Sequence, residues 1–99
     1  MAQRKSKNRN AYDITASILK ASAKGSGRTH IMYRANLSFR LLNEYLARLV
    51  NSGLLECQER ERRVIYSLSE SGAAFLESYR TIQTLYARKL KRLPHRKKR

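Results

Sequence analysis

Arginine and asparagine side chains recur along residues 38–51 at the spacing of one helix face, and these groups can hydrogen-bond to nucleic acid. In the major groove of a duplex, Arg can donate two hydrogen bonds to guanine, and Asn can pair with adenine. Glu44 opposes phosphate but can accept a hydrogen bond from cytosine. At 100° per residue, the apolar and polar side chains separate onto opposite faces. The apolar face holds Leu42, Tyr45, Leu46, Leu49 and Val50, and the polar face holds Arg40, Asn43, Glu44, Ala47, Arg48 and Asn51.

Basic residues gather at both ends of the chain. The sequence has 22 Lys and Arg against 7 Asp and Glu, a formal net charge of +15. Four of the bases lie in residues 1–11 and eight in residues 88–99, and neither range contains an acid. Cationic arms around a nearly balanced centre are typical of a protein that grips phosphate. The alternatives are arms that serve only solubility, and attraction to an anionic membrane.

No set of side chains in the sequence has the composition of a catalytic or metal site. Cys57 is the only cysteine, which excludes an intramolecular disulfide and favours an intracellular protein. His30 has no companion ligands for a metal, and no Ser/His/Asp or Cys/His set is evident. We therefore expect no enzyme activity, no cofactor, no metal and no small-molecule ligand. No apolar run approaches the roughly 18 residues of a membrane span, so we also expect no membrane contact.

The amphipathic segment is the third of three predicted helices. Asp13 is the candidate cap of the first, residues 28–34 form a short second helix, and Ser38 caps the third, over residues 39–51. Residues 24–27 form a connector, because the full pattern of a phosphate-binding glycine loop is absent. A short helix, a tight turn and an amphipathic helix together have the layout of a helix-turn-helix. The apolar positions of the first two helices are Ile14, Ile18, Ala21, Ile31 and Met32.

Two runs of alternating residues follow and predict a β-hairpin. Leu55 and Cys57 alternate with polar residues in the first run, residues 64–68 alternate in the second, and residues 59–63 form a charged turn. This alternation points Cys57 inward and assigns it to the core. The order of elements predicts a mainly α chain with a small β-hairpin, of the α+β class, in which the hairpin is the wing of a winged helix-turn-helix.

A long last helix is predicted from its cap, Ser69, to Pro94. Its apolar residues step by three and four, the spacing of a coiled-coil seam. A helix of this length extends beyond a winged domain, so we expect a homodimer. Acids at its start and bases at its end favour an antiparallel pair, and the alternative is a monomer whose helix folds back. The seam comprises Leu76, Tyr79, Gln83, Tyr86, Leu90 and Leu93, with Phe75 and Ile82 beside it as anchors to the domain.

These elements divide the chain into four segments. We expect a flexible basic arm over residues 1–11, a winged helix-turn-helix over 12–69, a dimerisation helix over 70–93 and a basic tail over 94–99. The recognition helix would read base edges while the wing and the arms hold phosphates. The acidic residues at the wing tip weaken the expected contact between the wing and DNA. The candidate DNA contacts are Arg28, Arg34, Ser38, Arg40, Asn43, Arg48, Arg60, Arg62 and Arg63.

With these elements placed, the sequence resembles the archaeal winged-helix chromatin proteins typified by Sso-ten-a of Sulfolobus. The sharpest likeness is residues 31–38, IMYRANLS, and residues 66–72, YSLSESG, resemble the passage from wing to last helix in many winged-helix regulators. The resemblance covers residues 12–90. It implies a homodimer joined by an antiparallel coiled coil, which binds double-stranded DNA with little sequence preference. The last helix looks shorter and the tail more basic than in that family.

The sequence thus predicts a cytoplasmic, nucleoid-associated protein that binds double-stranded DNA in chromatin organisation or transcription regulation. A site-specific repressor can use the same scaffold, because fold does not decide function. An RNA-binding or ribosome-associated protein would carry the same basic arms. A protein-interaction module would use only the last helix. Loss of binding after changes at Arg40 and Arg48 would favour DNA over these alternatives.

Overall fold

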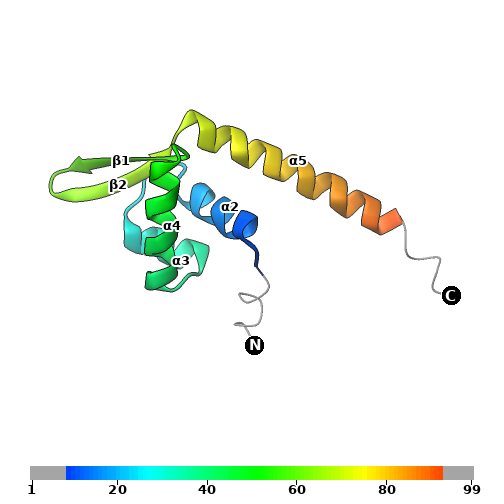
Figure 1. Ribbon diagram of the computed structural model, residues 1–99, viewed down its shortest axis with the longest axis horizontal. Coiled ribbons are helices and arrows are strands. Elements are labelled where there is room, and N and C mark those ends of the chain that lie inside the picture. Colours follow the sequence, from blue (N-terminus) through cyan, green and yellow to red (C-terminus); the bar gives the residue numbers. More distant parts are fainter. Residues whose placement is uncertain (1–8, 93–99) are drawn as a thin grey trace.

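The computed structural model describes residues 9–92, in which four helices surround the base of a two-stranded hairpin (Figure 1). The first three helices and the hairpin form a head, and the last helix leaves it as a long arm. This arrangement confirms the predicted mainly α chain with a small hairpin and the winged helix-turn-helix fold. The elements are α2 (Ala11–Ala21), α3 (Arg28–Ala35), α4 (Phe39–Asn51), β1 (Leu55–Arg60), β2 (Arg63–Leu68) and α5 (Glu70–Arg92).

Helix α2 begins earlier than predicted. Its cap is Asn10, whose side chain accepts the N–H of Asp13 at 2.8 Å, while the Asp13 carboxylate accepts the N–H of Asn10. The prediction of Asp13 as the cap is therefore wrong, because Asp13 is the reciprocal partner in a capping box. Arg9 is also part of the head, since it donates to Ser17 Oγ and to the Ala35 carbonyl, both at 2.9 Å. The flexible arm predicted for residues 1–11 cannot include residues 9–11, and residues 1–8 lie outside the described part of the chain.

The core lies where α2, α3 and α4 meet. The side chains of Ile18, Leu19, Ile31 and Leu42 are fully buried there, and Met32 packs against them half-buried. Asn36 ends α3 in the left-handed conformation at φ 58°, and Gly53 at φ 85° follows the end of α4. Both positions suit residues that tolerate positive φ. The apolar face predicted for α4 is confirmed, because Leu42, Leu46 and Leu49 are all buried.

The hairpin projects from the head with longer strands and a shorter turn than predicted. Its strands pair antiparallel from Leu55↔Leu68 to Arg60↔Arg63, so only Glu61 and Arg62 form the turn, with φ of 49° and 69°. In β1 only the first residue is buried, whereas Tyr66, the β2 residue opposite Cys57, is 5% exposed: β2 lies between β1 and the Ser26 segment, and β1 is the open edge of this small sheet. Cys57 is accordingly exposed, and its assignment to the core is wrong.

A third segment joins the base of the hairpin. Ser26, in the connector between α2 and α3, exchanges two backbone hydrogen bonds with Tyr66 at 2.9 and 2.8 Å. The connector predicted from its glycines is thus also an edge of the small sheet. This pairing holds β2, and with it the wing, against the start of α3.

Helix α5 is fastened to the head by residues of its first half. Ser69 caps it as predicted, accepting the N–H of Gly72 at 3.0 Å and donating to the Gly53 carbonyl at 2.6 Å. A Cβ on Gly72 would lie 2.2 Å from the carbonyl oxygen of Leu54, so glycine permits this close approach. Leu76 is only 5% exposed and anchors the helix in the core. The predicted stop at Pro94 lies outside the described residues.

Candidate nucleic-acid interface

Helix α4 presents a polar face to solvent along its whole length. Its start is fixed by Ser38, whose hydroxyl accepts the N–H of Leu41 at 3.1 Å, so this candidate contact is also the helix cap. Burial of the opposite face sets the rotation of the helix and confirms the predicted phase. The exposed residues of the polar face are Arg40, Glu44, Ala47, Arg48 and Asn51.

Two arginines of α4 and one of α3 are available to a partner on this side of the head. Arg40 is exposed in the first turn of α4, and Arg34 is exposed in the last turn of α3. The guanidinium of Arg48 lies 5.7 Å from the centre of the Tyr45 ring. A guanidinium at this distance from an aromatic face is attracted to it and loses some of its conformational freedom. Arg48 is therefore partly preorganised, while its N–H groups stay in solvent.

Arg28 and Asn43, both predicted DNA contacts, contact each other. Arg28 opens α3, and its Nη1 donates to Asn43 Oδ1 at 2.7 Å, while its Nη2 donates to the Tyr66 hydroxyl at 2.6 Å. Its guanidinium also lies 5.7 Å from the centre of the Tyr66 ring. This node links α3, α4 and β2. The sequence had no signal for the contact with Tyr66, which is 38 residues away along the chain.

A shallow groove separates α4 from the wing, next to this node. It has a volume of about 370 Å³, and Ala47, Asn51 and Cys57 line it together with Arg28 and Asn43. Because Ala47 has a short side chain, the groove stays open toward solvent. Polar and apolar atoms of α4 and β1 thus line this groove, next to the face of α4 that the sequence predicts to enter DNA.

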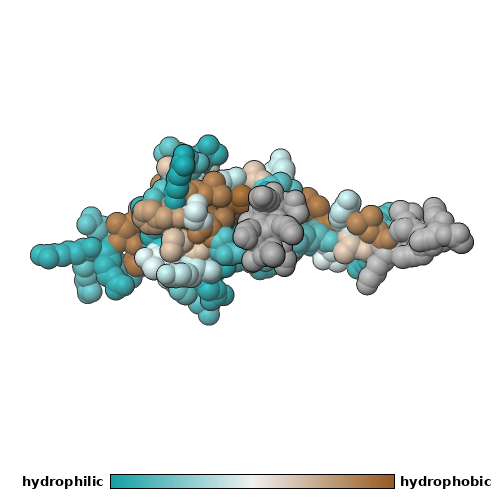
Figure 2. All heavy atoms as spheres, turned by 90° about the horizontal axis from the view of Figure 1, so that it is seen from below, coloured by the Kyte–Doolittle hydropathy of each residue, from teal (hydrophilic) through white to brown (hydrophobic). Residues whose placement is uncertain are grey.

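The wing carries the remaining candidate contacts. Arg60, Arg62 and Arg63 are exposed around the turn, as are Glu59 and Glu61, which offset much of the positive charge. Figure 2 shows hydrophilic side chains at the end of the molecule where the wing lies. With a nearly neutral tip, the wing is expected to bind a phosphate backbone weakly.

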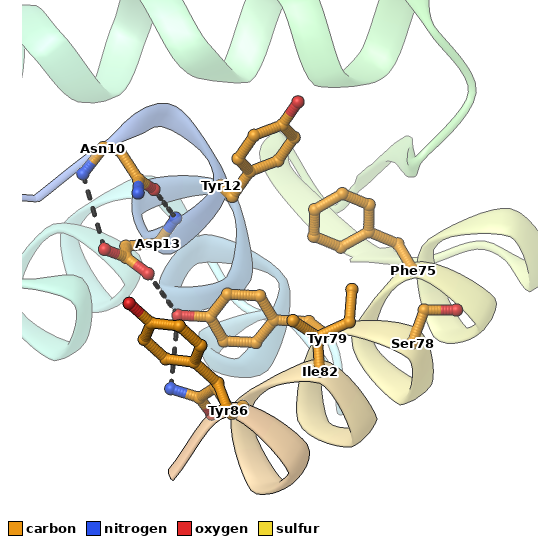
Figure 3. Close-up of a pocket in the computed structure, with 9 residues that line it drawn as sticks. Asn10, Tyr12, Asp13, Phe75, Ser78, Tyr79, Ile82 and Tyr86 are labelled. Atoms are coloured by element: carbon orange, nitrogen blue, oxygen red, sulfur yellow. Dashed lines mark hydrogen bonds between the residues drawn. The ribbon is translucent and has the colours of Figure 1, made fainter. Parts of the chain in front are cut away.

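A second surface lies between α2 and α5, on which aromatic side chains gather (Figure 3). The Tyr79 hydroxyl donates to the Asp13 carboxylate and so fastens α5 to α2. This hydrogen bond, reinforced by partial burial and the Asp13 charge, raises the pKa of Tyr79 to about 12. The groove has a volume of about 590 Å³, and it is lined by Asn10, Tyr12, Asp13, Phe75, Ser78, Tyr79, Ile82, Gln83 and Tyr86.

The predicted seam of α5 is split between two environments. Leu76 and Tyr79 make contacts within the head, and Gln83 donates weakly to the Tyr79 hydroxyl at 3.5 Å. Tyr86 and Leu90 are 65% and 46% exposed. Leu93 lies outside the described residues. Of the two predicted anchors to the domain, Phe75 packs against the core as predicted, whereas Ile82 is 64% exposed and the prediction for it is wrong.

Two features are absent from residues 9–92, a cluster of metal-ligating side chains and a membrane-spanning helix. No group of three or more His, Cys, Asp or Glu side chains in this range is placed to hold a metal ion. Among the helices described, none combines the length and the apolar character needed to cross a membrane.

Comparison with solved structures identifies several similar chains. Sso10a-2, a DNA-binding protein from Sulfolobus solfataricus, is 28% identical over 84% of this chain and 92% of its own, with a TM-score of 0.70. The transcriptional regulator BldR from the same organism is 20% identical over 83% of this chain and 63% of its own, with a TM-score of 0.67. A mutant form of MepR from S. aureus is 17% identical, covers 96% of this chain and 74% of its own, and has a TM-score of 0.71.

The comparison with curated proteins found no match. A family model described as winged helix-turn-helix matches residues 8–87, which include every element of the head and most of α5. This chain therefore belongs to the winged helix-turn-helix family.

Proposed function

We propose that this protein binds double-stranded DNA and acts in chromatin organisation or transcription regulation. The observation that carries the proposal is the polar face of α4, exposed along its length, with an open groove between it and β1 of the wing. A helix of this kind fits the major groove, where its first turns reach base edges. The naming of Sso10a-2 as a DNA-binding protein, at 28% identity over most of both chains, supports the same conclusion.

The charge distribution supports a mainly electrostatic grip. The net charge of +15 is concentrated toward the ends of the chain, and most of the basic residues there lie outside the described range. Lys and Arg that neutralise phosphates release counterions, so affinity for any duplex falls steeply as salt rises. Glu44, on the reading face of α4, opposes phosphate and limits how tightly that face can bind without a suitable base. The charge at the ends thus favours binding with modest sequence preference, as in the Sso-ten-a type, and Glu44 is a residue that would add a preference for particular bases.

We also propose a homodimer in which the α5 helices pair antiparallel. Beyond Tyr79 the helix leaves the head, yet it still exposes Ile82, Tyr86 and Leu90 on one side. Exposed apolar side chains in a row along a helix indicate a partner helix. Tyr12, 68% exposed on α2, extends this apolar surface toward the head. A second copy of α5 would cover both parts.

The DNA-binding proposal is tested by Arg40→Ala and Arg48→Ala in gel-shift titrations with duplex DNA and with RNA. We expect each variant to bind duplex several-fold more weakly with an unchanged melting temperature, because both side chains are exposed. Arg80→Ala, which removes the same charge from the exposed surface of α5, is the control and should have a smaller effect. Unchanged duplex affinity in both α4 variants would refute the role of the helix. Equal binding of RNA through the same residues would favour an RNA-binding protein.

A further inference from the structure

The node at Arg28 determines which atom of the Asn43 side chain faces outward. A guanidinium has only donor groups, so the Asn43 atom 2.7 Å from Arg28 Nη1 has to be the carbonyl oxygen, Oδ1. The amide nitrogen Nδ2, with its two N–H donors, is then the other terminal atom of the planar carboxamide, and it is not the atom bound to Arg28. The orientation of this amide follows from the chemistry of its partner.

The guanidinium that holds Asn43 is itself held at its other nitrogen. Arg28 Nη2 donates to the hydroxyl of Tyr66, a residue that is only 5% exposed. The backbone of Tyr66 is paired in turn with Ser26, next to the start of α3. Arg28 is therefore fixed between a buried strand residue and the recognition helix, and it cannot turn away from Asn43 without breaking a short charge-assisted hydrogen bond.

Asn43 lies at the border between the core face and the reading face of α4. It is half-buried and lines the open groove beside Ala47 and Asn51, one turn and two turns further along the same side of the helix. A base edge that entered this groove would meet the Asn43 amide with its Oδ1 already bound to Arg28, which lines the same groove. The group offered to that base is the Nδ2 donor.

We propose that Arg28 is a positioning residue that makes Asn43 a hydrogen-bond donor toward DNA, so that this position reads the N7 acceptor of either purine. This inference rests on the proposed function. The bidentate pair of Asn with adenine needs Oδ1 to accept from the adenine N6 amine while Nδ2 donates to N7. Arg28 already takes one of the two lone pairs of Oδ1, and its positive guanidinium beside that oxygen opposes a second donor such as the N6 amine, so the bond to N7 becomes the main one, and guanine presents N7 as well. Adenine and guanine are thus read alike.

Duplexes with 7-deazapurines test this reading, because a carbon replaces N7 while base pairing is kept. Four duplexes of one sequence would contain ordinary purines, 7-deazaadenine, 7-deazaguanine, or both. For the wild-type protein we expect each single replacement to weaken binding roughly two- to tenfold, the effect of one lost hydrogen bond. Asn43→Ala isolates the contribution of this residue, since the other arginines of α4 can also reach guanine N7. It should lose most of its response to 7-deazaadenine.

Changes at Arg28 separate positioning from simple loss of structure. In Arg28→Met the Asn43 amide is released and can pair with adenine at both atoms, so the response to 7-deazaadenine should grow relative to that for 7-deazaguanine. Arg28→Lys keeps a donor beside Oδ1 and should restore the wild-type pattern. Melting temperatures show whether each variant is folded, and a structural role alone would lower affinity for all four duplexes equally.

The outcomes that would overturn the inference are distinct from those that would overturn the proposed function. A wild-type protein that responds to 7-deazaadenine alone would show that Asn43 forms the full adenine pair, and the role of Arg28 would be refuted. The role of Arg28 would also be refuted if Arg28→Met and the wild-type protein responded identically to the 7-deazapurine duplexes. A wild-type protein that binds none of the duplexes would refute DNA binding itself, and with it any reading by Asn43.

Discussion

Replacement of Leu90 by aspartate should convert the protein into a folded monomer. Leu90 lies on the part of α5 that has left the head, where it is 46% exposed, so the substitution does not disturb the core. In the proposed dimer its side chain would be covered by the α5 helix of the second copy. A carboxylate at this position would face the apolar side chains of Ile82 and Tyr86 from the partner helix.

The size of the effect can be estimated from the exposure of Leu90 in the single chain. About half of its side chain remains to be buried by a partner, which is worth about 1 kcal/mol per copy. A carboxylate brought into an apolar contact adds a penalty of about 1 kcal/mol or more per copy, since it keeps part of its water. Both copies carry the change, so the dimer loses about 4 kcal/mol, which weakens its dissociation constant about a thousandfold.

Sedimentation equilibrium over a range of concentrations measures this constant directly. Thr84→Asp is the matched control, because it adds the same charge to the same helix at an exposed position on the opposite face. The control should stay dimeric, and both variants should keep the melting behaviour of the head. The Leu90→Asp monomer should also bind duplex more weakly, because two linked heads profit from a high effective concentration.

The direction of the pair is tested by cysteine crosslinking in a Cys57→Ser background. In an antiparallel pair, a chain with Ile82→Cys should crosslink to a chain with Leu90→Cys more efficiently than to another copy of itself. Efficient self-crosslinking at both positions would indicate a parallel pair. A wild-type protein that is monomeric at micromolar concentration, or equal effects of the two aspartates, would refute the reasoning.

Two further predictions concern the head and the wing. Tyr79→Phe removes the hydrogen bond to Asp13 and should lower the free energy of unfolding by about 1 kcal/mol. The pKa of Tyr79 rises from 10.0 to about 12 on folding. The stabilisation from this hydrogen bond is therefore complete below pH 10 and is lost as the pH rises through 12. Denaturant titrations that give parallel pH profiles for wild type and variant would contradict this. Replacing Glu61 and Arg62 by Asn and Gly should raise stability by about 1 kcal/mol, because both turn residues have positive φ. A lower midpoint of thermal unfolding would show that the Glu61 and Arg62 side chains stabilise the turn.

The elements of the fold could be predicted because local signals mark their ends. Ser38 and Ser69 cap helices as predicted, and the apolar period of α4 set its rotation correctly. The error at Asp13 arose because either member of a capping box has the side chain of a cap, and only the backbone shows which residue precedes the helix. Cys57 was misplaced because alternation identifies the two sides of a strand but cannot show that β1 is the open edge of the sheet, while Tyr66 opposite Cys57 is buried.

The candidate interface was predicted less completely, because part of it depends on contacts between distant residues. Residue type placed Arg40, Arg48 and the wing arginines on the surface, where the structure also has them. It could not distinguish them from Arg28, since an arginine that holds an asparagine amide has the same local sequence signal as one that reaches DNA. Whether each of these residues contacts DNA stays a prediction.

The apolar stripe on α5 is wide, and the sequence alone does not show which part of it packs on the head. A wide stripe has one edge toward Leu76 and Gln83 and another toward Phe75 and Ile82, and periodicity alone cannot tell which edge faces the same chain. The structure buries Leu76 in the head and leaves Ile82, Tyr86 and Leu90 exposed. Phe75, on the same edge as Ile82, packs against the core, so exposure depends more on the distance along α5 from the head than on the edge, and the exposed surface continues to Tyr12 on α2. A helix that packs on this surface would contact the start of one head as well as its α5 helix, and so would hold the two heads at a set separation on the duplex.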